Sequence, residues 1–253
     1  MEFFVKKDSV VRTIWGKSDT VLFIFAGAAA EFALNKAVDW LYFTGRLPAD
    51  PIGRLFSTVR YARMIVFSPK EEAEKAIQKI TAIHSGVEKS RGASIPDWAY
   101  RDVLFMLIHY SIAAFELLER KLTPSEKKEV YQVFYRLGKG MDLKDLPLSY
   151  EDWLPVRETH MQEDLALSAY SKDLFLQYKK HLGPTRYKIL KEAQLLVIPD
   201  RVKNLLSFGK FSWLAPAVPM YKFARVIRMD NFIKKILLPS AYREQIRELD
   251  VVR

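Results

Sequence analysis

The sequence predicts an all-α fold, a single multi-helix globular domain with long buried core helices. Helix capping residues, prolines at first helical positions and glycines at helix ends recur along the 253 residues. No alternation of apolar and polar residues persists beyond a few positions, so no sheet is expected. Hydrophobic residues make up 49% and aromatic residues 13% of the chain, which favours a packed core over disorder.

The first expected helix covers residues 19–44, a mostly apolar run that begins at Asp19 and ends where Gly45 breaks it. Asp50 then precedes Pro51, which is the order of an N-cap followed by a proline at the first helical position. This pair predicts a second helix over 51–67.

Two capping boxes are expected to start the next helices. Ser68 to Glu71 has the pattern in which a hydroxyl and a carboxylate cap each other's backbone, and it predicts a helix that ends near Lys89. Asp97 is expected to cap a helix that reaches about Lys121. Thr123 to Glu126 is the second capping box, and it starts a further helix.

Glycine and proline divide the remaining chain. Gly138 and Gly140 are expected to end the helix that follows the second capping box, and Ser149 to open the next. Gly183-Pro184 separates two more helices, and prolines 199, 216 and 219 divide the last third into shorter pieces. We expect a helical domain over 15–206, with a basic helical extension over 207–253 packed on it or attached to it.

The composition excludes several classes of site. The chain has no cysteine, which excludes disulfides, thiolate-bound zinc, iron–sulfur clusters and covalently attached c-type haem. It also lacks the nucleotide-binding glycine loops, the G-x-S-x-G elbow and the H-E-x-x-H motif. A metal would therefore depend on His, Asp, Glu or Tyr ligands.

The net charge of +10 is concentrated near the C-terminus, where residues 201–253 carry 11 Lys and Arg but 4 Asp and Glu. Apolar residues interleave with these charges, which suits a peripheral membrane surface better than nucleic acid, although an ordinary solvated helical face explains it equally well. The most apolar stretch, Val21 to Ala30, is too short to span a bilayer, which takes about 20 residues. We therefore expect a buried helix there and a cytoplasmic protein.

Two histidines lie on apolar helical faces. His84 follows Ile80 by four positions and precedes Val87 by three, so it is expected to point into the core. His109 shares a face with Phe105 and Ile112. A buried imidazole needs a hydrogen-bond partner or a metal, and the spacing alone favours two unrelated core histidines over a shared cavity.

Arg54, Ser57 and Thr58 lie near the start of the second helix, with Arg54 and Thr58 on one face. An arginine beside a hydroxyl suits an anion such as a carboxylate or a propionate. The pattern fits a surface ion pair between Arg54 and Asp50 as well.

Glu31 interrupts the most apolar helix. If it is buried and unpaired, its pKa should be raised, which prepares a carboxyl group for proton transfer. An exposed position on the polar edge of the helix is an equally open interpretation. His160 and His181 have charged neighbours in the sequence and are expected at the surface.

The order of these motifs resembles that of the MpaB and latex-clearing rubber oxygenase family. The resemblance extends from about Trp15 to about Leu206, and three segments carry it: Gly45-x-Leu47-Pro48-x-Asp50-Pro51-x-x-Arg54-x-x-x-Thr58, then Ile83-His84-Ser85-Gly86-Val87, then Asp102-x-Leu104-x-x-x-Ile108-His109. Each motif is short, and their order and separation carry the specificity.

The resemblance implies a helical fold that binds haem b without a covalent link, with His84 as the proximal ligand of the iron. It implies that Arg54 and Thr58 lie near the haem, that His109 has a structural or supporting role, and that Glu31 is a positional match for a catalytic glutamate. The family's lysine position is Ser57 here. The implied activity is an oxidoreductase reaction with O2 on a hydrophobic, isoprenoid-like substrate, by analogy the oxidative cleavage of a carbon–carbon double bond.

Three other functions can be compared with the sequence. A helical protein that binds a lipid or isoprenoid without a cofactor would need the same apolar interior. A basic protein that binds nucleic acid would use the C-terminal part, but no aromatic-interleaved basic stripe or helix-turn-helix pattern supports it. A non-haem metal enzyme lacks a recognisable two-histidine, one-carboxylate spacing.

Overall fold

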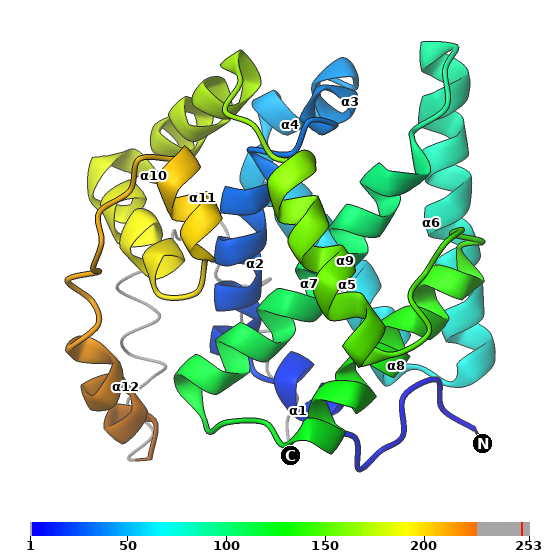
Figure 1. Ribbon diagram of the computed structural model, residues 1–253, viewed down its shortest axis with the longest axis horizontal. Coiled ribbons are helices and arrows are strands. Elements are labelled where there is room, and N and C mark those ends of the chain that lie inside the picture. Colours follow the sequence, from blue (N-terminus) through cyan, green and yellow to red (C-terminus); the bar gives the residue numbers. More distant parts are fainter. Residues whose placement is uncertain (1, 227–248, 250–253) are drawn as a thin grey trace.

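The computed structural model describes residues 2–226 and residue 249, and its helices follow one another with short connections (Figure 1). In chain order the helices are α1 (Val10–Trp15), α2 (Ser18–Phe32), α3 (Val38–Phe43), α4 (Arg46–Ala49), α5 (Pro51–Phe67), α6 (Lys70–Arg91), α7 (Asp97–Leu118), α8 (Pro124–Gly140), α9 (Tyr150–Glu163), α10 (Ala169–Leu195), α11 (Asp200–Leu205) and α12 (Ala217–Val226).

Strand pairing is limited to two isolated bridges in this part of the chain, Phe3 with Pro69 and Asn35 with Leu165. The predicted all-α class and the single multi-helix domain are therefore confirmed. None of the helices formed by the described residues combines the length and the apolar character that a bilayer span requires.

Helix α2 lies at the centre of the molecule and packs along α7 (Figure 1). The two helices approach closely because Gly27 has no side chain: a Cβ at this position would overlap the ring of Tyr110. The alanines that follow, at positions 28–30, are also buried. The run of small residues in the sequence therefore allows close packing of the two core helices.

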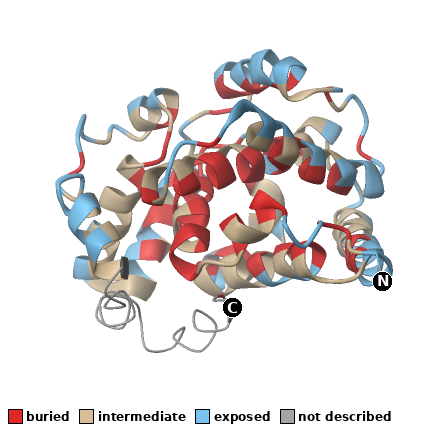
Figure 2. Cartoon of the chain, turned by 90° about the horizontal axis from the view of Figure 1, so that it is seen from below, coloured by how far each residue is buried: buried red, intermediate tan, exposed pale blue. Residues whose placement is uncertain are grey.

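The other helices surround this pair. Helices α5 and α6 pack on each other, α8 packs on α7, and α10 packs on α2. Buried residues concentrate on the inner faces of the helices, and exposed residues line the outer faces (Figure 2). The packing forms one continuous hydrophobic core.

Several predicted helix boundaries are confirmed. The Asp50 carboxylate accepts a hydrogen bond from the Gly53 amide and caps α5. Thr123 and Glu126 form the predicted capping box at the start of α8. Gly183 adopts a positive φ of 74° and breaks α10 into two helical halves, as expected from the glycine–proline pair.

Two predicted boundaries are wrong. The helix expected over 19–44 is divided into α2 and α3, because the Asn35 side-chain oxygen accepts a hydrogen bond from the Ala37 amide in the turn between them. The capping box expected at Ser68 is not formed. Its backbone is extended, and α6 begins only at Lys70, whose amide donates to the Glu2 carbonyl.

The proposed C-terminal extension is described only in part, and residues 227–248 and 250–253 lie outside the described residues. Within the described part, α12 is attached to the core helices: Arg225 forms ion pairs with Asp19 in α2 and with Glu119 after α7. Leu249 is buried in the hydrophobic core. The domain boundary at residue 206 stays a prediction.

Candidate functional site

The residues singled out in the sequence fall into two groups in the structure. His84, Arg54 and Thr58 lie on the adjacent helices α5 and α6 and form the first group. Glu31 and His109 lie on α2 and α7, where they belong to a buried polar network.

His84 is half-buried on α6, and its ring lies 5.1 Å from the ring of Tyr100 on α7. The Nδ1 atom is fully enclosed and has no hydrogen-bond partner among the residues described. Burial and the positive charge of Arg54 lower the pKa of His84 to about 4, although Glu88 opposes them. The imidazole is therefore neutral at pH 7.

The predicted position of His84 on a face of α6 that points into the core is only partly confirmed. Ala73, Ala76 and Ile77 are buried, but Ile83 is 43% exposed. The apolar face of α6 therefore opens to solvent beside His84, so this histidine lies at the margin of the core and not at its centre.

The Arg54 guanidinium is oriented by its own helix. Its Nη1 atom donates to the hydroxyls of Ser57 at 3.1 Å and Thr58 at 3.0 Å. Each hydroxyl in turn donates to the Arg54 carbonyl. The sequence spacing thus correctly brings Arg54 and Thr58 together, and the positive charge of Arg54 acts on His84 of the neighbouring helix.

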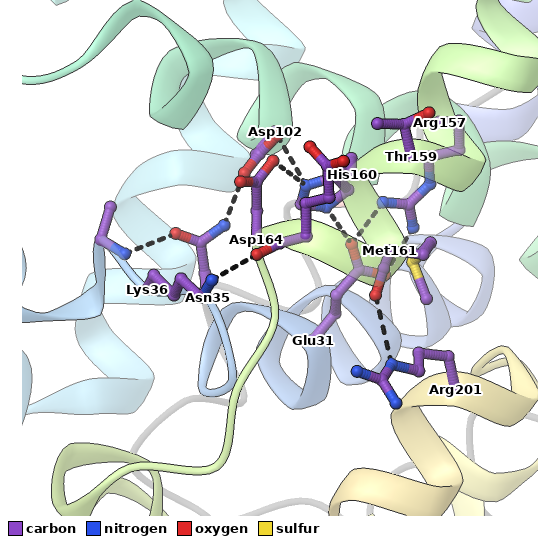
Figure 3. Close-up of polar contacts among 12 residues, drawn as sticks. Glu31, Asn35, Lys36, Asp102, Arg157, Thr159, His160, Met161, Asp164 and Arg201 are labelled. Atoms are coloured by element: carbon purple, nitrogen blue, oxygen red, sulfur yellow. Dashed lines mark hydrogen bonds and ion pairs between the residues drawn. The ribbon is translucent and has the colours of Figure 1, made fainter.

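Glu31 is completely buried and lies in the middle of the polar network (Figure 3). Arg157 of α9 binds it with two hydrogen bonds, Nη1 to Oε1 at 2.6 Å and Nη2 to Oε2 at 2.5 Å. The Tyr110 hydroxyl donates to Oε2 at 2.8 Å, and His160 Nε2 lies 3.2 Å from Oε1. The interpretation of Glu31 as an exposed residue is therefore wrong.

The partners of Glu31 also decide its ionisation. Burial alone would raise the pKa of this carboxyl, but the charge and hydrogen bonds of Arg157 and the hydrogen bond of His160 outweigh it and hold the pKa well below its usual range. The raised pKa considered for an unpaired Glu31 does not apply. The carboxylate stays ionised and joins α2, α7 and α9.

His160 is buried, with 3% of its side chain exposed, so its predicted surface position is wrong. Its Nδ1 atom lies 2.7 Å from Asp102 Oδ1 and 3.3 Å from Asp164 Oδ2. Burial lowers its pKa, but the hydrogen bonds to Asp102 and Glu31 outweigh this and raise the pKa to about 9. His160 is consequently a cation between carboxylates on both sides.

Asp102 extends the network towards the α2–α3 turn. Its second oxygen, Oδ2, accepts a hydrogen bond from the Asn35 side-chain amide at 2.8 Å. Burial raises the pKa of Asp102, and the hydrogen bonds from His160 and Asn35 act in the opposite direction. The network therefore connects the turn that ends α2 to the buried faces of α7 and α9.

His109 is half-buried on α7, with its ring edge-on to that of Tyr110 at 4.9 Å. Burial and the charge of Arg157 lower its pKa to about 4, and Glu31 opposes them. His109 is thus a neutral imidazole beside the Glu31–Arg157 ion pair, whereas the pKa of His84 responds to Arg54 and Glu88. The described contacts give the two histidines no common partner.

Arg157, His160 and Asp102 were not recognised as candidate site residues from the sequence. A signal was present: Trp153, Arg157, His160 and Met161 recur at helical spacing and form the buried face of α9. Of these residues only His160 was considered from the sequence, and its charged neighbours led to the prediction of a surface position.

Asp102, His160 and Asp164 each offer one possible metal-ligand atom, and these atoms lie within 4.8 Å of one another. Two carboxylates and an imidazole suit zinc or iron. The raised pKa of His160, however, favours a proton on Nδ1 between the two carboxylates. The contacts of the group are those of an ion-pair network, and a metal would have to displace this proton.

Comparison with known protein families assigns the chain to a class of oxygenase catalytic domains. Residues 15–247 match the family of the ER-bound oxygenase mpaB/B′ and rubber oxygenase catalytic domain. Because the match covers most of the chain, the protein belongs to this family, and it is an enzyme of the oxidoreductase class. No curated protein matches the chain.

Proposed function

We propose that the protein is a haem b-dependent oxygenase that acts with O2 on a lipophilic, isoprenoid-like substrate, by oxidative cleavage of a carbon–carbon double bond. The family match supports the oxygenase class. The observation that carries the haem assignment is His84, a neutral imidazole whose enclosed Nδ1 atom has no partner in the described part of the chain.

The donor set fits haem b in two respects. Iron binds the neutral form of imidazole, and the lowered pKa of His84 keeps this form at pH 7. Arg54 provides a positive charge near His84, and Thr58 provides a hydroxyl on the same helical face. A guanidinium paired with a hydroxyl is suited to a propionate carboxylate.

Each residue then has a defined task. His84 would hold the iron, and Arg54 and Thr58 would bind a propionate. Haem b, when bound, supplies the activation of O2. Ser57 has no amine to offer at the position of the family's lysine, and its hydroxyl is already engaged with Arg54. We therefore propose that no side-chain amine from α5 would help to hold the iron in this chain.

Glu31 and His109 have less direct tasks in this proposal. The Glu31 carboxylate receives hydrogen bonds from Arg157 and Tyr110, so it is poorly prepared to donate a proton. Its contacts support a structural role in joining α2, α7 and α9, and its catalytic assignment stays a prediction. His109 packs beside this group, and we propose that it also supports the packing of these helices.

The test is the visible absorption spectrum of the protein produced with a haem precursor, before and after reduction. We expect a Soret band that shifts on reduction. His84→Gly should remove the band or shift it, and added imidazole should restore it, because the small ligand can occupy the vacated position. His181→Gln is the matched control, since His181 hydrogen-bonds to the Gln177 and Ala49 carbonyls on α10 and α4; its spectrum should be unchanged.

The outcomes separate the haem assignment from the fold. If the wild-type protein remains colourless and does not bind added hemin, the haem proposal is wrong. If a stoichiometric lipid is then found by organic extraction and mass spectrometry, binding without a cofactor becomes the better function. If haem binds and His84→Gly leaves the spectrum unchanged, only the ligand assignment fails.

A further inference from the structure

An exposed stretch without charged side chains lies next to α10 and runs into α12. The eleven residues from Phe211 to Tyr221 contain no Asp, Glu, Lys or Arg, and Lys210 and Lys222 flank them. Phe211 is 89% exposed, and Met220 is 74% exposed. Large apolar side chains that are exposed close together in the sequence indicate an interaction site.

The attachment of α12 explains why Met220 and Phe223 face outward. Tyr221 and Arg225 bind Asp19 on α2, at 3.2 Å and 3.0 Å. Met220 and Phe223, which are three residues apart and so adjacent on the helix, are exposed. Helix α12 lies at the margin of the molecule (Figure 1), so one face is fixed to the core and the other is open.

Positive charges border the apolar side chains. Residues 179–226 contain ten Lys and Arg but two Asp and Glu. Lys188 Nζ lies 6.0 Å from the centre of the Trp213 ring, and Trp213 is 52% exposed. Glu192, one of the two acidic residues, is engaged as the acceptor for the Trp213 amide. Arg225 and Lys203 are paired with carboxylates, but among the described residues no ion pair involves Lys188 or Lys210.

We infer that this region is a docking surface for an anionic lipid bilayer. The surface, called the basic apolar surface below, consists of Phe211, Trp213, Met220 and Phe223 with the bordering Lys188 and Lys210. Aromatic side chains insert at the boundary between headgroups and acyl chains, and lysines attract anionic headgroups. A tryptophan next to a lysine satisfies both requirements at one point.

Charge argues against the other occupants. A second copy of the chain would bring the same positive surplus against this surface, and like charges repel. The phosphate backbone of a nucleic-acid duplex would satisfy the lysines but would leave the uncharged centre without a complementary partner, because the bases of a duplex are already stacked. An anionic bilayer offers negative charge at its surface and an apolar interior beneath it, which matches both parts of the basic apolar surface.

The experiment is sedimentation of the full chain with vesicles of phosphatidylcholine alone or of phosphatidylcholine mixed with phosphatidylglycerol. We expect binding to the mixed vesicles, with lower affinity at higher salt. Lys188→Gln and Lys210→Gln should each lower the affinity about fivefold, the fold-change expected from about 1 kcal/mol per basic residue near the membrane. The double variant Phe211→Ser with Trp213→Ser should reduce binding further. It should also reduce the binding that remains at high salt, because that binding depends on the apolar side chains.

Matched controls use exposed residues elsewhere. Lys75→Gln and Lys139→Gln remove the same charge from α6 and α8, and Leu148→Ser with Leu176→Ser remove comparable exposed apolar side chains. These variants should retain binding. Equal loss in the control and test variants would overturn the proposed surface.

Other results would also overturn the proposal. They are equal binding to both vesicle types, no binding to either, or a dimer in light scattering that the Phe211→Ser and Trp213→Ser variant abolishes. None of these results bears on haem binding or oxygenase activity, so the docking surface and the proposed function can fail separately.

Discussion

At the residue scale, the buried polar network shows how a charged group is accommodated in an apolar core. Glu31 is completely enclosed, and an isolated carboxylate there would be strongly destabilising. Arg157, His160 and Tyr110 supply donors to both of its oxygens. Because the three donors come from two other helices, the ionised state of Glu31 and the packing of α2, α7 and α9 depend on each other.

Removing one charge of this network should be costly. Glu31→Gln leaves the Arg157 guanidinium, whose side chain is 7% exposed, without an anionic partner. Breaking a buried ion pair in this way destabilises a protein by about 3–5 kcal/mol. Urea unfolding should show a clear decrease in the midpoint, whereas Glu151→Gln, which breaks the exposed pair with Lys128, should leave it nearly unchanged. Equal midpoints for both variants would contradict this role of Glu31.

His160 should make stability depend on pH on the alkaline side. Its pKa is about 9 in the folded protein, against the ordinary 6.5, so the folded state holds this proton more tightly. The stabilisation is fully present below about pH 6.5 and is lost as the pH rises through about 9, by about 3 kcal/mol. The charged groups facing His160 are Glu31, Asp102, Asp164 and Arg157.

The measurement is the free energy of unfolding at a series of pH values from neutral to alkaline. His160→Gln should start less stable and show a smaller decrease over this range. A wild-type decrease that His160→Gln reproduces in full would assign the pH dependence to another group.

The residues of the site were predictable to different degrees. The spacing of Arg54 and Thr58 fixes their contact within one helix turn, so the sequence could show it. The spacing placed His84 and His109 on apolar helical faces, but which partner affects each depends on how different helices pack. His160 was missed because its two buried partners, Glu31 and Asp102, come from other helices, and no local pattern records such contacts.

At the element scale, local signals succeeded where the chain itself supplies the partner. The caps at Asp50 and Thr123 use backbone amides only three residues away. Ser68 failed because distant contacts hold its neighbours: Pro69 forms a bridge with Phe3. The apolar run after Asp19 did not reveal the end of α2 for the same reason, since Asn35 is fixed by Asp102 of α7.

Two glycines inside helices should respond oppositely to alanine. Alanine favours a helix over glycine by about 1 kcal/mol. Gly86 on α6 has open space at its Cβ position, so Gly86→Ala should stabilise the protein by up to this amount. At Gly27 the new methyl group would overlap Tyr110, and overpacking costs about 1–3 kcal/mol, so Gly27→Ala should be destabilising. Thermal unfolding of both variants is the measurement, and the same sign for both would contradict the close approach of α2 and α7.

At the scale of the whole molecule, the sequence predicted one helical domain, and the continuous core confirms it. The basic C-terminal part is integrated at the points that the structure describes. Arg225 ties α12 to Asp19 and Glu119, and Arg63 of α5 donates to the carbonyl of Leu249. The family match also continues to residue 247. These contacts argue that residues after 206 contribute to the stability of the domain.

Ending the chain at residue 206 tests this argument. The truncated protein would leave Asp19, whose side chain is 6% exposed, without its Arg225 partner, and would remove Leu249 from the core. We expect a lower unfolding temperature than that of the full chain, because a buried carboxylate loses its compensating charge and apolar area is lost. Differential scanning calorimetry is the measurement, and Arg225→Gln in the full chain isolates the ion-pair part of the loss. An unchanged unfolding temperature for the truncated protein, or two separate transitions in the full chain, would instead make the C-terminal part an independent extension.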